Sequence, residues 1–203
     1  MNSIMEWIHS GQYLERKIAQ NKGDFMKKVV IITSSLRPNS NSDLLADSFK
    51  QGALEAGNEV EVISLKGKKL DFCRGCMACQ KLGKCVIQDD ANPIMEKICE
   101  ADVVVWSTPT YYYTMSGNMK TLIDRCNALF SKDYKFRDVY LLITAAEDEE
   151  YTPKQVIGGI QGWVDCFDKA NFKDHLFVGG VSDAGEIKGH PGLAKAFEMG
   201  KRV

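Results

Sequence analysis

The sequence predicts an α/β protein with a doubly wound, five-stranded parallel sheet in the strand order 2-1-3-4-5. Two observations support this prediction. Short runs rich in Val and Ile alternate along the 203 residues with longer segments of helical periodicity. The first run, residues 29–32, is apolar without interruption, which is typical of a strand buried on both faces of a parallel sheet.

The predicted strands are short apolar runs bounded by turn residues. After the first run they lie at residues 59–65, 102–107, 139–145 and 176–181. In this order the first and third strands are neighbours. The loops that follow these two strands therefore open into the same crevice at the carboxyl edge of the sheet.

The predicted helices carry apolar residues at the spacing of one helical face. Cys99, Cys126 and Cys166 fall on these faces, which indicates ordinary buried thiols. The first predicted helix follows the first strand and is capped by Ser42 or Asp43. Four more are predicted at residues 91–100, 118–130, 153–169 and 191–201.

The composition is that of one globular domain, because 44% of the residues are hydrophobic and the formal net charge is -1. No apolar run is long enough to span a bilayer, no basic stripe suggests nucleic acid, and no signal peptide is evident. We therefore predict a cytoplasmic protein that binds neither membranes nor nucleic acid. Its seven cysteines are then not a disulfide framework, because that compartment keeps thiols reduced.

The first 25 residues differ from the rest, because two glycines interrupt their weak helical tendency. We predict an N-terminal extension at residues 1–25 and a folded domain at residues 26–203. Residues 22–25 can be encoded by a purine-rich stretch containing GGAG, where a bacterial ribosome-binding site for Met26 would lie. Translation from Met26 is one interpretation. A helical arm that packs on a neighbouring subunit is the other.

The polar stretch SSLRPNSNS, residues 34–42, separates the first strand from a helix. Such a loop holds a phosphate in α/β proteins, because loop amides and the positive end of the helix dipole face the anion. It lacks GxxxxGK[ST] and GxGxxG, so a lone terminal phosphate fits better than a nucleoside triphosphate or a dinucleotide. The alternative is a connection whose Ser and Asn residues only cap a helix and form turns. The side chains that can bind the phosphate are Ser34, Ser35, Arg37, Ser40, Asn41 and Ser42.

The loop after the third strand, TPTYYYTMSG at residues 108–117, opens into the same crevice. Tyr111, Tyr112 and Tyr113 can cover a flat conjugated ring that would otherwise stay in water. The alternative is that these side chains pack between subunits or on their own loop. A phosphate site beside a planar-ring site describes FMN better than any other common cofactor.

Four cysteines, Cys73, Cys76, Cys79 and Cys85, form a Cys-rich insertion after the second predicted strand. Four thiolates can bind one [4Fe-4S] cluster, and two glycines in the segment let the backbone turn around it. Zinc is an alternative, although structural zinc usually takes two separated pairs of ligands. A third interpretation is a cysteine-rich lid whose thiols stay reduced or form disulfides.

These motifs resemble a known family. SSLRPNSNS and PTYYYTMSGNMKTLIDR are similar to the NAD(P)H-dependent FMN reductases, a flavodoxin-like family, and the C-x2-C-x2-C-x5-C spacing resembles its iron-sulfur flavoprotein branch. The resemblance runs from Met26 to about the last helix. Glycine is more usual after the fourth strand, so AAEDEE is a departure from the family pattern. The resemblance implies that the phosphate is bound by Ser34, Arg37, Ser40, Asn41 and Ser42. It implies that the isoalloxazine ring is contacted by Pro109, Thr110, Tyr111 and Tyr112. The pyrimidine side of the ring would be approached by Thr144, Ala145, Ala146 and Glu147.

The family resemblance implies an FMN-dependent oxidoreductase. NADH or NADPH would pass hydride to the flavin, which would then reduce a quinone, a flavin or another small acceptor, with a [4Fe-4S] cluster as a further electron carrier. The resemblance also implies a homodimer or a higher homo-oligomer. A hypothesis from another class is a non-enzymatic carrier that moves electrons between partner proteins.

Overall fold

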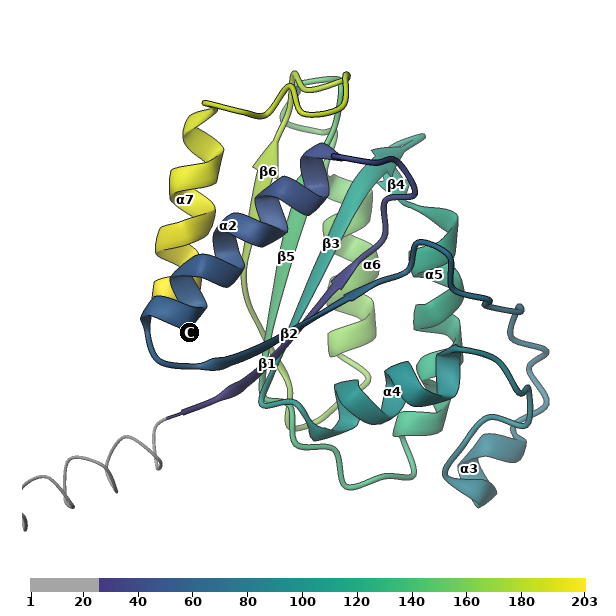
Figure 1. Cartoon of the computed structure of the whole chain (residues 1–203). Coiled ribbons are helices and arrows are strands. Elements are labelled where there is room, and N and C mark those ends of the chain that lie inside the picture. Colours follow the sequence, from purple (N-terminus) through teal and green to yellow (C-terminus); the bar gives the residue numbers. More distant parts are fainter. Residues whose placement is uncertain (1–25) are drawn as a thin grey trace, which may run out of the picture.

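The computed structural model describes residues 26–203, so the predicted extension at residues 1–25 lies outside the described residues. A mainly parallel sheet forms the middle layer (Figure 1). The predicted α/β fold with helices on both faces of a parallel sheet is confirmed. One face packs against α2 (Asn41–Glu55) and α7 (Pro191–Lys201), and the other against α4 (Ala91–Glu100), α5 (Gly117–Arg125) and α6 (Lys154–Val164).

The sheet has six strands, one more than predicted. The additional strand, β4 (Thr114–Met115), pairs antiparallel with the end of β3. The prediction misses it because a two-residue strand leaves no periodicity in the sequence. The five parallel strands are, in the order in which they pair, β2 (Glu59–Ser64), β1 (Lys28–Thr33), β3 (Val103–Tyr111), β5 (Asp138–Thr144) and β6 (Asn171–Val178).

The central strand β1 packs on both layers of helices. Val30 and Ile32 belong to the core under α4, α5 and α6, whereas Val29 and Ile31 belong to the core under α2 and α7. All four side chains are fully buried, as the uninterrupted apolar run predicts. Each contributes about 1.5–3 kcal/mol by burial, which fixes the middle of the sheet.

A close crossing of α2 and α7 aligns the loops that precede these two helices. A Cβ atom added to Gly52 would lie 1.9 Å from the carbonyl oxygen of Phe197, and one added to Gly200 would lie 2.0 Å from that of Phe49. Only glycine allows the two backbones to approach so closely. The crossing therefore brings the loop after β1 beside the loop after β6.

The predicted helices at residues 91–100 and 191–201 match α4 and α7. The helix predicted at 118–130 is instead α5 followed by a 3-10 turn, η1 (Cys126–Leu129), and α6 ends at Val164 rather than at residue 169. The predicted helices are too long because buried apolar residues continue after the backbone has left the α-helix. Within residues 26–203, none of the helices is long and apolar enough to cross a membrane.

Three further local predictions are wrong. The last strand covers 171–178 rather than 176–181, because this edge strand begins with exposed polar residues that hide the strand pattern. The N-cap of α2 is Ser40 rather than either predicted residue, since its Oγ accepts the amide of Asp43 at 3.1 Å. Cys166 is exposed because it lies beyond the end of α6.

Candidate functional site

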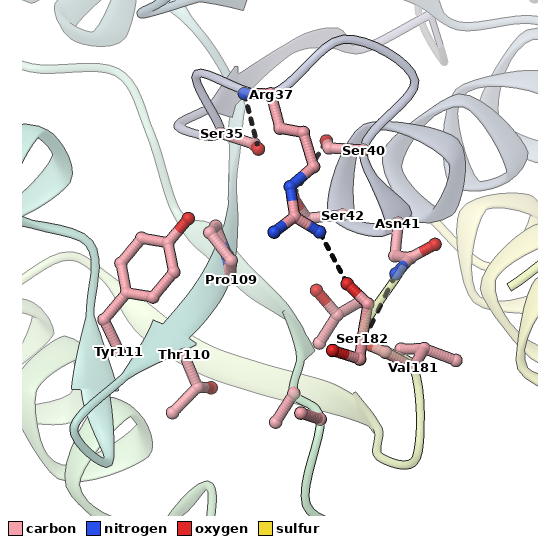
Figure 2. A pocket seen from close by; sticks show the side chains of 13 residues that line it. Ser35, Arg37, Ser40, Asn41, Ser42, Pro109, Thr110, Tyr111, Val181 and Ser182 are labelled. Atoms are coloured by element: carbon pink, nitrogen blue, oxygen red, sulfur yellow. Dashed lines mark hydrogen bonds between the residues drawn. The ribbon is translucent and has the colours of Figure 1, made fainter. Parts of the chain in front are cut away.

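A cavity of about 200 Å³ opens at the carboxyl edge of the sheet. It is formed by the loops after β1, β5 and β6 and by the end of β3, which meet because parallel strands end at the same edge. Figure 2 shows the side chains that surround it. The lining residues are Ser35, Arg37, Ser40, Asn41, Ser42, Pro109, Thr110, Tyr111, Thr144, Ala145, Ala146, Val181 and Ser182.

Ten of the thirteen residues predicted for the flavin site line this cavity, and Ser34, Tyr112 and Glu147 do not. Three lining residues are absent from this set of thirteen: Ser35, which the phosphate-loop prediction does include, and Val181 and Ser182, which follow β6. Val181 and Ser182 are missed because the sequence pattern extends the last strand to residue 181, so no loop is expected before that position. A correct end for that strand would reveal a further loop at the same sheet edge.

The N-terminus of α2 supplies an anion-binding end to the cavity. The capping oxygen of Ser40 lies 3.3 Å from the hydroxyl oxygen of Ser42, and both residues line the cavity. The aligned peptide dipoles of this fifteen-residue helix place their positive end here. A terminal phosphate fits such a helix end without further cations.

Arg37 joins the loop after β1 to the loop after β6 (Figure 2). Its Nη1 donates to the carbonyl oxygen of Ser182 at 2.5 Å, and its backbone amide donates to Oγ of Ser35 at 3.3 Å. The other guanidinium N–H groups donate to no described residue. These groups are therefore free to form charged, two-pronged hydrogen bonds to an anion in the cavity.

Asn41 lines the cavity but uses its side-chain amide to hold the loop after β6. Its Nδ2 donates to the carbonyl oxygens of Asp183 at 2.9 Å and Val181 at 3.3 Å, and its Oδ1 accepts the amide of Ile187 at 3.1 Å. The amide group is thus saturated by protein partners. Asn41 therefore shapes the cavity, and its side-chain amide is not available to a ligand.

Ser34 is fully buried behind the cavity and connects three elements. Its hydroxyl donates to the carbonyl oxygen of Ser107 at 3.2 Å and accepts from Oγ of Ser116 at 2.8 Å. Its carbonyl oxygen accepts Nδ2 of Asn118 at 2.8 Å. Ser34 therefore fixes the end of β1 to β3 and to the start of α5.

Thr110 lines the cavity, and its side chain carries an unused polar group. Its Oγ1 is buried and has no hydrogen-bond partner within the described residues. A buried hydroxyl without a partner costs about 1–3 kcal/mol, so it marks a place where a ligand atom can complete the hydrogen bond. Pro109 and Tyr111 on either side offer apolar surface. This end of the cavity suits a flat ring with polar edge atoms, which is the chemistry of an isoalloxazine.

The hairpin between β3 and β4 turns at Tyr112 and Tyr113, which both have positive φ, 47° and 65°. Two such residues form the tight turn that suits a hairpin, but the conformation is unfavourable for tyrosine. Tyr112 is 97% exposed and does not line the cavity. The ring of Tyr113 lies 5.9 Å from that of Tyr151.

Glu147 lies outside the cavity, where hydroxyl groups hold its carboxylate. It accepts hydrogen bonds from Thr152 Oγ1 at 2.7 Å, Tyr151 Oη at 3.2 Å and Tyr113 Oη at 3.5 Å. The hydrogen bond to this carboxylate raises the pKa of Tyr151. Glu147 therefore links the loop after β5 to the hairpin and lines no part of the cavity.

The cysteine segment, residues 73–85, lies between β2 and α4 and contains the short helix α3 (Ala78–Leu82) at the margin of the molecule (Figure 1). Cys79 is buried, Cys76 is exposed, and Cys73 and Cys85 are half-buried. Burial raises the pKa of Cys79, and negative charge on Cys85, Cys76 or Cys73 would raise it further. The described residues nevertheless contain no group of three or more ligands gathered around a metal position.

Arg125 and Asp89 form a buried ion pair beneath the cysteine segment, which the sequence analysis misses. Both side chains are fully buried, and Asp89 Oδ2 and Oδ1 accept Nη1 and Nη2 of Arg125 at 2.7 Å and 2.9 Å. Burial alone would raise the pKa of Asp89, but hydrogen bonds from Arg125 and from the amides of Asp71 and Ala91 lower it. An arginine in the last turn of an otherwise core-facing helix was the available signal.

Residues 27–150 match the family model of the NADPH-dependent FMN reductases. The chain is 40% identical over 102 residues to an iron-sulfur flavoprotein of Methanocaldococcus jannaschii. This aligned region covers 50% of this chain and 53% of that protein. The chain is 37% identical over 112 residues to an iron-sulfur flavoprotein of Archaeoglobus fulgidus, which covers 55% of this chain and 54% of that protein. The chain thus spans about half the length of these curated relatives.

Among solved structures, the NAD(P)H:quinone oxidoreductase from Methanothermobacter marburgensis superposes with a TM-score of 0.66. The two chains are 19% identical, and the match covers 87% of this chain and 96% of the other. At this identity the likeness establishes the fold alone.

Proposed function

The chain belongs to the NADPH-dependent FMN reductase family, and on that premise we propose that it is an oxidoreductase that binds FMN in the cavity at the carboxyl edge of the sheet. The observation that carries the proposal is the pairing of two complementary ends in one cavity. One end is the N-terminus of α2, which suits a phosphate, and the other is the unpartnered hydroxyl of Thr110, which suits a ring edge.

The proposed roles follow from the lining. The start of α2, with Ser40 and Ser42, binds the phosphate, and Arg37 adds its charge. Thr110 forms a hydrogen bond to the ring edge, while Pro109 and Tyr111 orient the ring and exclude water from it. When bound, FMN would accept hydride from NADH or NADPH and pass electrons to a small acceptor such as a quinone or a flavin.

For the cysteine segment we propose a [4Fe-4S] cluster on Cys73, Cys76, Cys79 and Cys85. The donor set has the right chemistry, since four thiolates bind such a cluster. Positive φ at Gly75 gives the segment one of its sharp turns. Both similar relatives carry the name iron-sulfur flavoprotein. Zinc and free thiols are the competing occupants, and a metal analysis decides among them.

The experiment is purification without oxygen, followed by a visible spectrum and a steady-state assay of NAD(P)H oxidation with quinone and ferric acceptors. FMN and sustained turnover support the reductase. Bound FMN without turnover would favour an electron carrier between proteins, and protein that binds no FMN would contradict the proposal. An absorption band of iron-sulfur type, with about four irons per chain, supports the cluster.

We propose that residues 26–203 form the flavin-binding unit, which acts in the cytoplasm as a homodimer or a higher homo-oligomer. The strongly exposed Tyr112 beside the cavity is consistent with a neighbouring subunit at this position. Size determination in solution tests the assembly. A Tyr112→Ser variant that dissociates would place this tyrosine in the contact.

A further inference from the structure

Arg125 is a buried cation that the proposed flavin chemistry does not use. Besides its ion pair with Asp89, Nη1 donates to the carbonyl oxygen of Asp71 at 2.7 Å and Nη2 to that of Ile87 at 3.3 Å. All of these partners lie between β2 and α4, on either side of the cysteine segment. The last residue of α5 thus ties down both ends of that segment.

The remaining donor of Arg125 points at a sulfur. Its Nε donates to Sγ of Cys85 at 3.2 Å. The backbone of Cys85 is also held, because its amide donates to Oδ1 of Asn92 and its carbonyl oxygen accepts Nδ2 of Asn92, both at 3.0 Å. By contrast, the side chains of Cys73 and Cys76 form no hydrogen bond to another described residue. Cys79 is buried and its carbonyl oxygen accepts Oγ of Ser131 at 3.3 Å, but among the described residues only Cys85 of the four has its sulfur held by a side chain.

The other end of the same helix contacts Ser34, which lies behind the flavin cavity. Ser116 caps the start of α5 and donates to Oγ of Ser34, and Asn118 donates to the carbonyl oxygen of Ser34. A helix of nine residues spans about 13 Å. α5 is thus a short rigid connection between the loop after β1 and the sulfur of Cys85.

We propose that Arg125 is a positioning residue that holds Cys85 as the fixed corner of the iron-sulfur site and makes the bound cluster easier to reduce. The inference rests on the proposed cluster. Reduction by one electron adds one negative charge, and a charged N–H donor on a ligand sulfur stabilises that charge. With FMN bound as proposed, the reduced flavin would be the source of that electron.

The first test is the reduction potential of the cluster in Arg125→Lys. Lysine keeps a cation beside Asp89 but has no Nε–H donor for Cys85. After reconstitution with iron and sulfide, we expect the cluster of this variant to be about tenfold harder to reduce, a shift of about 59 mV for a one-electron couple. Arg74→Lys makes the same chemical change on a side chain that bonds to no other described residue, and should leave the potential unchanged. Equal potentials in Arg125→Lys and the wild type would overturn the proposal.

The second test uses protein without iron, so that it is independent of the cluster. A double-mutant cycle combines Arg125→Lys with Cys85→Ala and measures unfolding in urea. We expect the two changes to be non-additive by about fivefold in the unfolding constant, because each removes the same hydrogen bond. The cycle of Arg125→Lys with Cys76→Ala should be additive.

The two possible failures are distinguishable. Wild-type protein that takes up no iron contradicts the cluster, and with it the effect on potential. An additive cycle between Arg125 and Cys85 instead contradicts the contact, whether or not iron binds. Equal flavin content in all variants shows that the fold is intact.

Discussion

The flavin cavity and the cysteine segment hold their functional groups in opposite ways. The cavity collects residues from positions 35 to 182, and the sheet brings together the strand ends and loops that carry them. The cysteine segment has its four sulfurs within thirteen positions, yet among the described residues only the sulfur of Cys85 accepts a hydrogen bond from a side chain of another element. Cysteines that are close in sequence are therefore not held in a fixed arrangement by that closeness alone. The sheet arranges its cavity before any ligand binds, whereas a short loop needs an anchor or a ligand.

Two carboxylates differ in whether a cation is paired with them, and their pKa values shift in opposite directions. Burial raises the pKa of Asp43, which follows the phosphate loop and whose Oδ1 has no described hydrogen-bond partner. Asp89, which has Arg125 as its partner, has a lowered pKa. Asp89 therefore contributes stability above its ordinary pKa of about 3.9, and this contribution is lost as the pH falls through the lowered value. Asp43 has the opposite sign.

The largest effect is expected from removing the cation under the cysteine segment. Arg125→Met leaves the buried carboxylate of Asp89 without its cation and with only the backbone amides of Asp71 and Ala91 as donors, so we expect a loss of about 3–5 kcal/mol in the free energy of unfolding. Urea unfolding measures it. The control is Lys120→Met, which breaks the exposed pair with Asp124 on the same helix and should cost about 0.3–0.5 kcal/mol. Equal losses in the two variants would show that the buried pair does not support this region.

The next effect concerns the phosphate end of the cavity. Arg37→Ala removes a charged donor, so we expect FMN binding to weaken by about 1.5–3 kcal/mol, while riboflavin, which lacks the phosphate, binds as before. Titration calorimetry with both ligands gives the comparison. Lys173→Ala, a change to an exposed cation on the edge strand β6, serves as the control. Equal losses for FMN and riboflavin would mean that Arg37 acts through the loop and not through the phosphate.

A smaller effect is expected at the ring end. Thr110→Val keeps the shape of the side chain and removes its unpartnered hydroxyl. We expect FMN and riboflavin to bind about 0.5–1.5 kcal/mol more weakly, because both lose one neutral hydrogen bond. The protein without flavin should be no less stable, since no protein contact is lost. Unchanged binding of both ligands would place the ring away from Thr110.

The smallest effect is the pH dependence that Asp43 imposes. A carboxyl with a raised pKa costs stability while it is charged, so Asp43→Asn should be slightly more stable than the wild type at pH 7. The difference should vanish as the pH falls below about 3.9, where both side chains are neutral. Urea midpoints across this range measure it. Asp168→Asn, at an exposed position beyond α6, should follow the wild type.

The sequence by itself determined the elements that depend on local pattern. The apolar run of β1 and the helical stripes of α4 and α7 identify these elements correctly, because burial imposes a periodicity that a single segment carries. The strand order then follows from the alternation of strands and helices, and it places the loops after β1 and β3 together. For this reason ten of the predicted flavin-site residues do lie around one cavity.

The tertiary structure alone decided what each of these side chains does. Asn41 could have faced a phosphate, but its amide is taken by the loop after β6, a loop that the sequence pattern did not assign to the site. Arg125 lies within the helix predicted at residues 118–130 and was given no role there, and only the packing of α5 brings it to Asp89 and Cys85. These contacts join residues at least 36 positions apart, Arg125 and Asp89 being the nearest in sequence. Because such pairs form only when separate elements pack, no pattern within one segment records them.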